Sequence, residues 1–155
     1  MVVSVWFSLT ILGAAQSTQA VQSPFTITIS TPRPVIKAWS PVMLKIVMTN
    51  TSEHAESYVV VAQKAHYDIV VTDEKGNPAP NTPYGQKIHR SNRSPLIGSS
   101  TMFRATLQPG EKRHSEVDIS KEYDLSQPGN YTISAQDIQG GITVKSNTIN
   151  VTITP

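Results

Sequence analysis

The sequence predicts an all-β domain built as a sandwich of two antiparallel sheets, with seven to nine strands. Hydrophobic residues recur at every second position in run after run of the chain, which is the period of a half-buried strand. Most of the 11 prolines and 8 glycines fall between these runs, where turns are expected. A sustained helical period is found in no segment, so the sequence does not predict a helix.

The alternating runs give the strands in order. The expected strands are residues 25–30, 42–49, 58–62, 67–72, 102–107, 114–119, 131–136 and 148–154, and residues 142–145 are either a ninth strand or an extension of the last. The faces that these runs turn inward are rich in Ile, Val and Leu, as two packed sheets require. Residues 137–141 end in a glycine pair and predict a hairpin between the last two long strands, because glycine supplies the positive φ of such turns.

The first residues have the composition of a signal peptide. Residues 2–15 are almost wholly apolar and uncharged, and the run is short for a membrane-spanning helix. Cleavage is expected after Ala20, or alternatively after Ala15. The sequence therefore predicts a signal peptide at 1–20 and one domain at 24–155, in a secreted or periplasmic protein. No Lys or Arg precedes the apolar run, so an uncleaved anchor is the alternative and the sole membrane contact expected.

Composition excludes several classes of function. The chain has no cysteine, which excludes disulfides, thiol catalysis and cysteine-ligated zinc. Its net charge of +2 is too small to indicate a nucleic-acid partner. The four histidines show no metal-ligand spacing, and there is no nucleophile elbow, phosphate loop or dinucleotide fingerprint. We therefore expect a protein that is not an enzyme, with no catalytic residue, metal or cofactor.

The most specific pattern lies between residues 107 and 133. It contains a Leu-Gln-Pro-Gly-Glu turn at 107–111, then Tyr-Asp-Leu at 123–125 and Gly-Asn-Tyr at 129–131. The last resembles the tyrosine corner of immunoglobulin-like folds, in which the tyrosine hydroxyl bonds back to the backbone. This resemblance implies an immunoglobulin-like antiparallel β-sandwich, with Tyr131 as the corner tyrosine and Gly129 and Leu125 as structural residues. Antibody domains carry a cysteine where this chain has Ile133, so the resemblance is to the architecture.

The same pattern is similar to that of bacterial exported sandwich domains, including the N-terminal sandwich segment of deuterolysin-type peptidases, which ends in a Ser-Asn-x-Ile-x-Val strand like residues 146–151. Residues 47–52 and 67–76 also resemble the sandwich of BsuPI-type proteinase inhibitors. The resemblance covers most of residues 25–154 and implies fold more than function, because its motifs are turn and core residues. It implies no peptidase activity, since the HExxH zinc motif is absent.

The longest segment without strand signals is 76–98, which the sequence predicts to be a loop. A loop this long is usually either functional or disordered. It lies in a stretch without acidic residues and holds a basic cluster. The expected contact residues are Tyr84, Lys87, His89, Arg90 and Arg93. A solvated insertion with no binding role is the alternative.

Trp39 allows two interpretations, a plug at the edge of the core or an exposed aromatic anchor, and the core is favoured because Trp is usually buried. Together these features predict a non-catalytic exported binding or structural module. Its expected partner is a protein or a cell-envelope component, not a nucleic acid. A proteinase inhibitor with an immunoglobulin-like fold is the alternative.

Overall fold

The chain is an immunoglobulin-like β-sandwich, as the sequence predicts. The structure is a computed structural model that describes residues 22–61, 67–93, 102–139 and 141–155. The predicted signal peptide at 1–20 lies outside the described residues. The described elements, in chain order, are β1 (Phe25–Ser30), β2 (Val35–Lys37), β3 (Met43–Asn50), β4 (Glu56–Val61), β5 (Asp68–Asp73), α1 (Pro83–Arg93), β6 (Met102–Leu107), β7 (Lys112–Asp118), the 3-10 turn η1 (Ile119–Lys121), β8 (Gly129–Gln139), β9 (Ile142–Lys145) and β10 (Ile149–Thr154).

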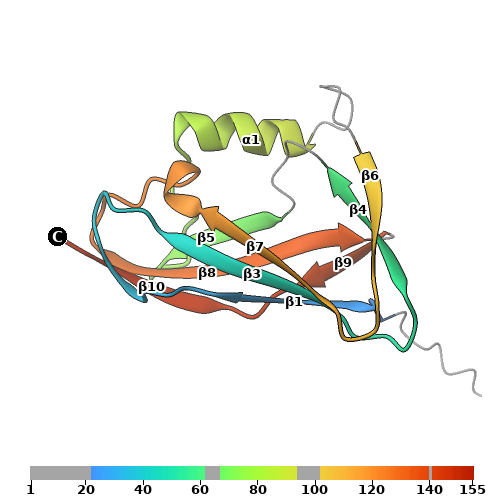
Figure 1. The fold of residues 1–155 in the computed structure, drawn as a ribbon. Coiled ribbons are helices and arrows are strands. Elements are labelled where there is room, and N and C mark those ends of the chain that lie inside the picture. Colours follow the sequence, from blue (N-terminus) through green and yellow to red (C-terminus); the bar gives the residue numbers. More distant parts are fainter. Residues whose placement is uncertain (1–21, 62–66, 94–101, 140) are drawn as a thin grey trace, which may run out of the picture.

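Two sheets form the sandwich (Figure 1). One has the order β1-β3-β7 and is antiparallel throughout. The other has the order β2-β10-β8-β5, with β9 paired to β8, and its edge strand β2 runs parallel to β10. The described residues thus form ten strands, β4 and β6 included, against the seven to nine predicted. The additional strand is β2, which is only three residues long.

The alternating side chains of both sheets meet in one core. Their buried members include Phe25, Ile27 and Ile29 of β1, Leu44, Ile46 and Met48 of β3, Ile69 and Val71 of β5, Tyr131, Ile133 and Ala135 of β8, and Val151 and Ile153 of β10. Burial of each large apolar side chain contributes about 1.5–3 kcal/mol, so packing alone can hold a sandwich without disulfides. The polar residues between them face outward, as the period of two requires.

The pair β3–β7 continues into a second pair, β4–β6, through a joint at Asn50. The Asn50 side chain is fully buried, and its amide nitrogen donates to the carbonyls of His54 at 2.7 Å and Leu107 at 2.9 Å. Its side-chain oxygen accepts from the backbone N–H and the hydroxyl of Ser52, each at 2.9 Å. One side chain thus satisfies backbone groups at the point where both strands leave the sheet.

The end of the chain forms the corner and hairpin that the sequence suggests. The Tyr131 hydroxyl donates to the Gln127 carbonyl at 3.0 Å, which is the bond expected of a tyrosine corner, and Leu125 is buried nearby in sequence. Gly129 is the first residue of β8. The hairpin connects β8 to β9, and Gly141 in its turn has φ of 83°. β10 then pairs with the earlier part of β8.

The predicted loop at 76–98 is wrong over Pro83–Arg93, which form the helix α1. It lies outside the strands on one side of the sandwich, near η1 (Figure 1). Within the described ranges, no helix is both long and apolar enough to cross a membrane.

Candidate functional site

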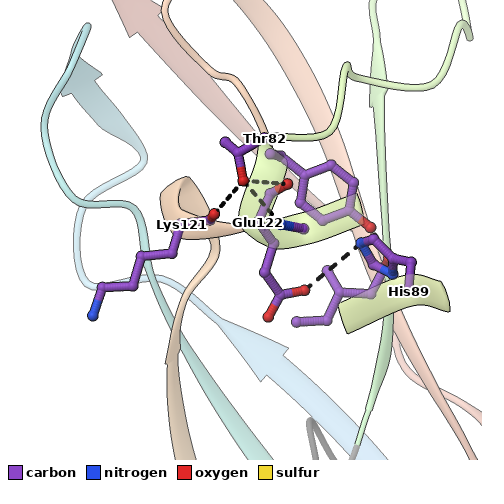
Figure 2. A network of polar contacts seen from close by, with 7 residues as sticks. Thr82, His89, Lys121 and Glu122 are labelled. Carbon is purple, nitrogen blue, oxygen red and sulfur yellow. Dashed lines mark hydrogen bonds and ion pairs between the residues drawn. The ribbon is translucent and has the colours of Figure 1, made fainter. Parts of the chain in front are cut away.

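The start of α1 is fixed by Thr82, the residue that precedes it. The Thr82 hydroxyl oxygen accepts from the N–H of Gly85 at 3.0 Å, and this is the bond of an N-cap. Pro83 takes the first helical position, where its lack of an N–H costs nothing. Thr82 also donates from its hydroxyl to the Lys121 carbonyl at 2.5 Å and from its backbone N–H to the Glu122 carbonyl at 2.9 Å (Figure 2). The cap therefore begins the helix and attaches it to the sandwich.

Gly85 brings the helix into direct contact with the backbone beyond η1. A Cβ atom placed on Gly85 would lie 2.0 Å from the Glu122 carbonyl oxygen and 2.8 Å from its carbonyl carbon. No side chain fits at such a distance, so only glycine permits this approach. The close packing of α1 on the sandwich thus depends on the missing side chain of Gly85 and not on a stripe of apolar residues.

A buried polar pair lies beneath the helix. The Glu122 side chain is 8% exposed, and its Oε2 lies 3.8 Å from Nε2 of His89 on α1 (Figure 2). Burial raises the pKa of the Glu122 carboxyl; His89 opposes this rise, and Asp68 adds to it. The distance of 3.8 Å exceeds hydrogen-bond length, so the two side chains form an ion pair only when His89 is protonated.

Tyr123 connects this pair to the second sheet. Its ring lies 5.4 Å from the His89 ring, measured between centroids, and its hydroxyl donates to the Ile69 carbonyl in β5. Burial is the main cause that raises the pKa of the Tyr123 hydroxyl, so it stays a protonated donor. Glu122, Tyr123 and His89 together dock α1 on the sandwich.

The structure divides the predicted contact residues. Tyr84 and Lys87 are exposed on α1, with Tyr84 54% exposed. His89 is instead half-buried against Tyr123, so it does not share their outer surface. Arg90 and Arg93 belong to α1, and their side chains lie outside the described ones.

Trp39 is not at the core edge, and the prediction for it is wrong. Its side chain is 87% exposed and its φ is 66°. It is the third residue of a turn in which the Ser40 N–H donates to the Lys37 carbonyl at 3.1 Å. The turn follows directly after the short strand β2, and the Trp39 side chain lies in solvent there.

A hollow of about 360 Å³ separates Trp39 from the start of α1. Its polar and apolar lining includes Asn81, Thr82, Ser120, Asp124, Leu125 and Ser126. No pattern in the sequence indicates this grouping, since Asp124 and Ser126 belong to a run that indicates only the fold and Asn81 lies far from them in the chain. Among the described residues, no cluster of three or more His, Asp or Glu side chains could hold a metal ion.

No protein-family model matches the chain, and no curated protein matches it. Among solved structures, the chain is similar to a β-glucosidase from Listeria innocua at 11% identity, with a TM-score of 0.46, over 84% of this chain and 16% of that one. It is also similar to a CARDB domain from Pyrococcus furiosus at 12% identity, with a TM-score of 0.44, over 84% of this chain and 87% of that one. An alkylpurine DNA glycosylase of Pseudomonas fluorescens matches at 14% identity, with a TM-score of 0.44, over 86% and 31% of the two chains.

Proposed function

We propose that this chain is a non-catalytic exported module that binds a protein or another component of the cell envelope through the helix α1. The observation that supports this is a basic helix fixed outside the sandwich. The α1 sequence includes Lys87, Arg90 and Arg93 and has no acidic residue. Export rests on the apolar segment at 2–15 and on the resemblance to exported sandwich domains.

The way in which α1 is held suits a contact surface. Thr82 and Gly85 join its first turn to the backbone at Lys121 and Glu122, and His89 packs against Tyr123 farther along. A surface that is ordered before binding loses little conformational entropy when a partner arrives. Positions 87 and 90, three residues apart, lie on the same side of a helix. The chemistry of this surface favours an acidic partner.

A docking role for Glu122 and His89 also supports the non-catalytic part of the proposal. The two side chains form an acid–base pair, but they lie beneath α1 with 8% and 18% exposure, and neither lines the hollow. A general acid or base must reach the proton that it transfers. Their position therefore fits the attachment of the helix better than turnover of a substrate.

The test is a pull-down from envelope and culture-fluid extracts with wild type and a variant carrying Lys87→Ala, Arg90→Ala and Arg93→Ala. We expect an acidic partner that wild type retains, that the variant loses, and that elutes as salt rises above about 0.15 M. The melting temperature should stay within about 2 °C, since the described contacts that attach α1 are made by Thr82, Gly85 and His89.

The matched control carries Lys75→Ala, Lys112→Ala and Lys145→Ala, which removes the same charge from exposed positions outside α1. It should keep the partner. Loss of the partner in both variants would mean that binding depends only on general charge attraction. A large fall in the melting temperature of the α1 variant would mean that the basic cluster stabilises the fold and does not form a binding surface.

A further inference from the structure

Trp39 is an outlier in two respects at once. A large aromatic side chain is 87% exposed, and its backbone has φ of 66°. The third position of such a turn favours glycine or asparagine, because a Cβ atom is strained there. Strained positions occur preferentially at functional sites, where the surrounding structure holds them in place. Nothing in the folding of the sandwich needs an indole at this turn, since the side chain packs little against the core.

The hollow beside Trp39 is preformed by hydrogen bonds in its walls. The Asp124 N–H donates to the Pro80 carbonyl at 2.8 Å, which holds the two sides of the hollow together. On the same wall, the Ser126 N–H donates to Asp124 Oδ1 at 3.1 Å. The Ser120 hydroxyl donates to Asp118 Oδ1 at 2.6 Å, which fixes the turn η1. A ligand would therefore meet groups already in position.

The residues that line the hollow determine which class of ligand it can bind. Asn81 and Asp124 are exposed, and the Asp124 carboxylate would repel an anion. A wholly apolar ligand would remove these polar groups from water without offering them a hydrogen bond, which is unfavourable. The flat face of an indole favours a ring with an apolar face of its own. A volume of about 360 Å³ is at the small end of ligand sites, enough for a single sugar ring.

We infer that the hollow beside Trp39 is a saccharide site, which takes a pyranose ring of a neutral polysaccharide. The C–H face of the ring lies on the indole of Trp39, and its hydroxyl edge meets Asn81 and Asp124. A pyranose has both features, an apolar face and a rim of hydroxyl groups. The site goes beyond the contact proposed for α1 and does not depend on it, because its ligand carries no charge.

The test is affinity electrophoresis of the protein in gels that contain hydroxyethylcellulose, galactomannan, xylan or soluble starch. We expect retardation by at least one of them, and an affinity weaker by about tenfold or more in Trp39→Asn, since an aromatic anchor is lost. Trp39→Tyr keeps an aromatic face and should retain part of the retardation. Asparagine tolerates positive φ, so the melting temperature of Trp39→Asn should equal or exceed that of wild type.

The inference is overturned if none of the four polysaccharides retards wild type, or if Trp39→Asn is retarded as strongly as wild type. The variant with Lys87→Ala, Arg90→Ala and Arg93→Ala separates the two proposals. It should be retarded as strongly as wild type even if it has lost its acidic partner, and equal loss of retardation in this variant would contradict a neutral-sugar site at Trp39.

Discussion

Asn50 and Glu122 are two buried polar side chains at irregular points of the same sandwich, and they are held in different ways. The Asn50 amide makes four hydrogen bonds between 2.7 and 2.9 Å. The Glu122 carboxyl is nearly as buried, and its one close charged contact within the described residues is His89 at 3.8 Å. The Asn50 amide thus has a hydrogen-bond partner for both its nitrogen and its oxygen, whereas the Glu122 carboxylate has a charged neighbour beyond hydrogen-bond distance.

The difference shows what each point of the fold requires. At Asn50 two strands leave the sheet together, and the buried Leu107 carbonyl there needs a partner that water cannot supply. At Glu122 the side-chain pair is one of several contacts that hold the helix, because backbone contacts at Thr82 and Gly85 attach it as well. We therefore expect large losses of stability at Asn50 and at Gly85, and a small, pH-dependent effect at Glu122.

The largest effect is expected for Asn50→Ala. It leaves the carbonyls of His54 and Leu107 and the N–H of Ser52 without their buried partner, so the free energy of unfolding should fall by about 3 kcal/mol or more. Urea unfolding measures this loss. Asn130→Ala is the control, because Asn130 is exposed and should cost about 0.5 kcal/mol at most. A loss as small as that of the control would mean that the joint does not depend on the amide.

Gly85→Ala should have the next largest effect. The new Cβ atom meets the Glu122 carbonyl oxygen at 2.0 Å, so α1 must shift and the free energy of unfolding should fall by about 2 kcal/mol. Helix propensity alone predicts the opposite sign, a gain of about 1 kcal/mol. Urea unfolding of Gly85→Ala beside Gln86→Ala, an exposed neighbour on α1, decides between them. Stabilisation of both variants would contradict the close contact between Gly85 and the Glu122 carbonyl.

The smallest effect is expected for Glu122→Gln, and its sign depends on pH. Burial raises the pKa of the Glu122 carboxyl above its ordinary value of 4.5, so the folded protein binds this proton more tightly than the unfolded chain does. Its contribution to stability is complete below that value and is lost as pH rises through the raised pKa. Gln has no such proton, so the variant should gain on wild type with rising pH, by less than about 1 kcal/mol at neutral pH.

Urea unfolding from about pH 4 to about pH 7 measures the difference in free energy of unfolding between wild type and Glu122→Gln. Glu53→Gln is the control, because it removes an exposed carboxylate far from α1. His89 and Asp68 are the charged groups that act on Glu122, and protonated His89 opposes the predicted change. If wild type is the more stable protein at neutral pH, the attraction to His89 outweighs the burial of the carboxyl.

The strands were predictable because each buries one face, and the sequence therefore alternates between apolar and polar residues along each strand. The corner at Tyr131 was predictable for a related reason, since its motif is local in sequence. The strand β2 was not, because its three residues cannot show a period and its pairing with β10 joins distant parts of the chain. The helix α1 was not, because its inner side carries Gly85 and the half-buried His89 beside a single partly buried aliphatic residue, Ile88, which is too little to show a helical period.

The candidate site was only partly predictable. The segment that carries Tyr84 and Lys87 could be singled out by its length and charge, although its conformation could not. The prediction for Trp39 was wrong because tryptophan side chains are usually buried. A turn with positive φ at a non-glycine residue cannot be recognised from composition. The hollow joins Trp39 to Asn81 and Asp124, three positions that only the sandwich brings together.

The register of β3 has a consequence for the order of folding. Its residues 45–50 pair with β1, close by in sequence, whereas Met43 pairs with Asp118 across most of the domain. The β1–β3 pair can therefore form early, but its apolar face is covered only when β7 and the opposite sheet are in place. During that interval Leu44, Ile46 and Met48 are unprotected, so the nascent chain is most prone to aggregate between synthesis of β3 and synthesis of β8.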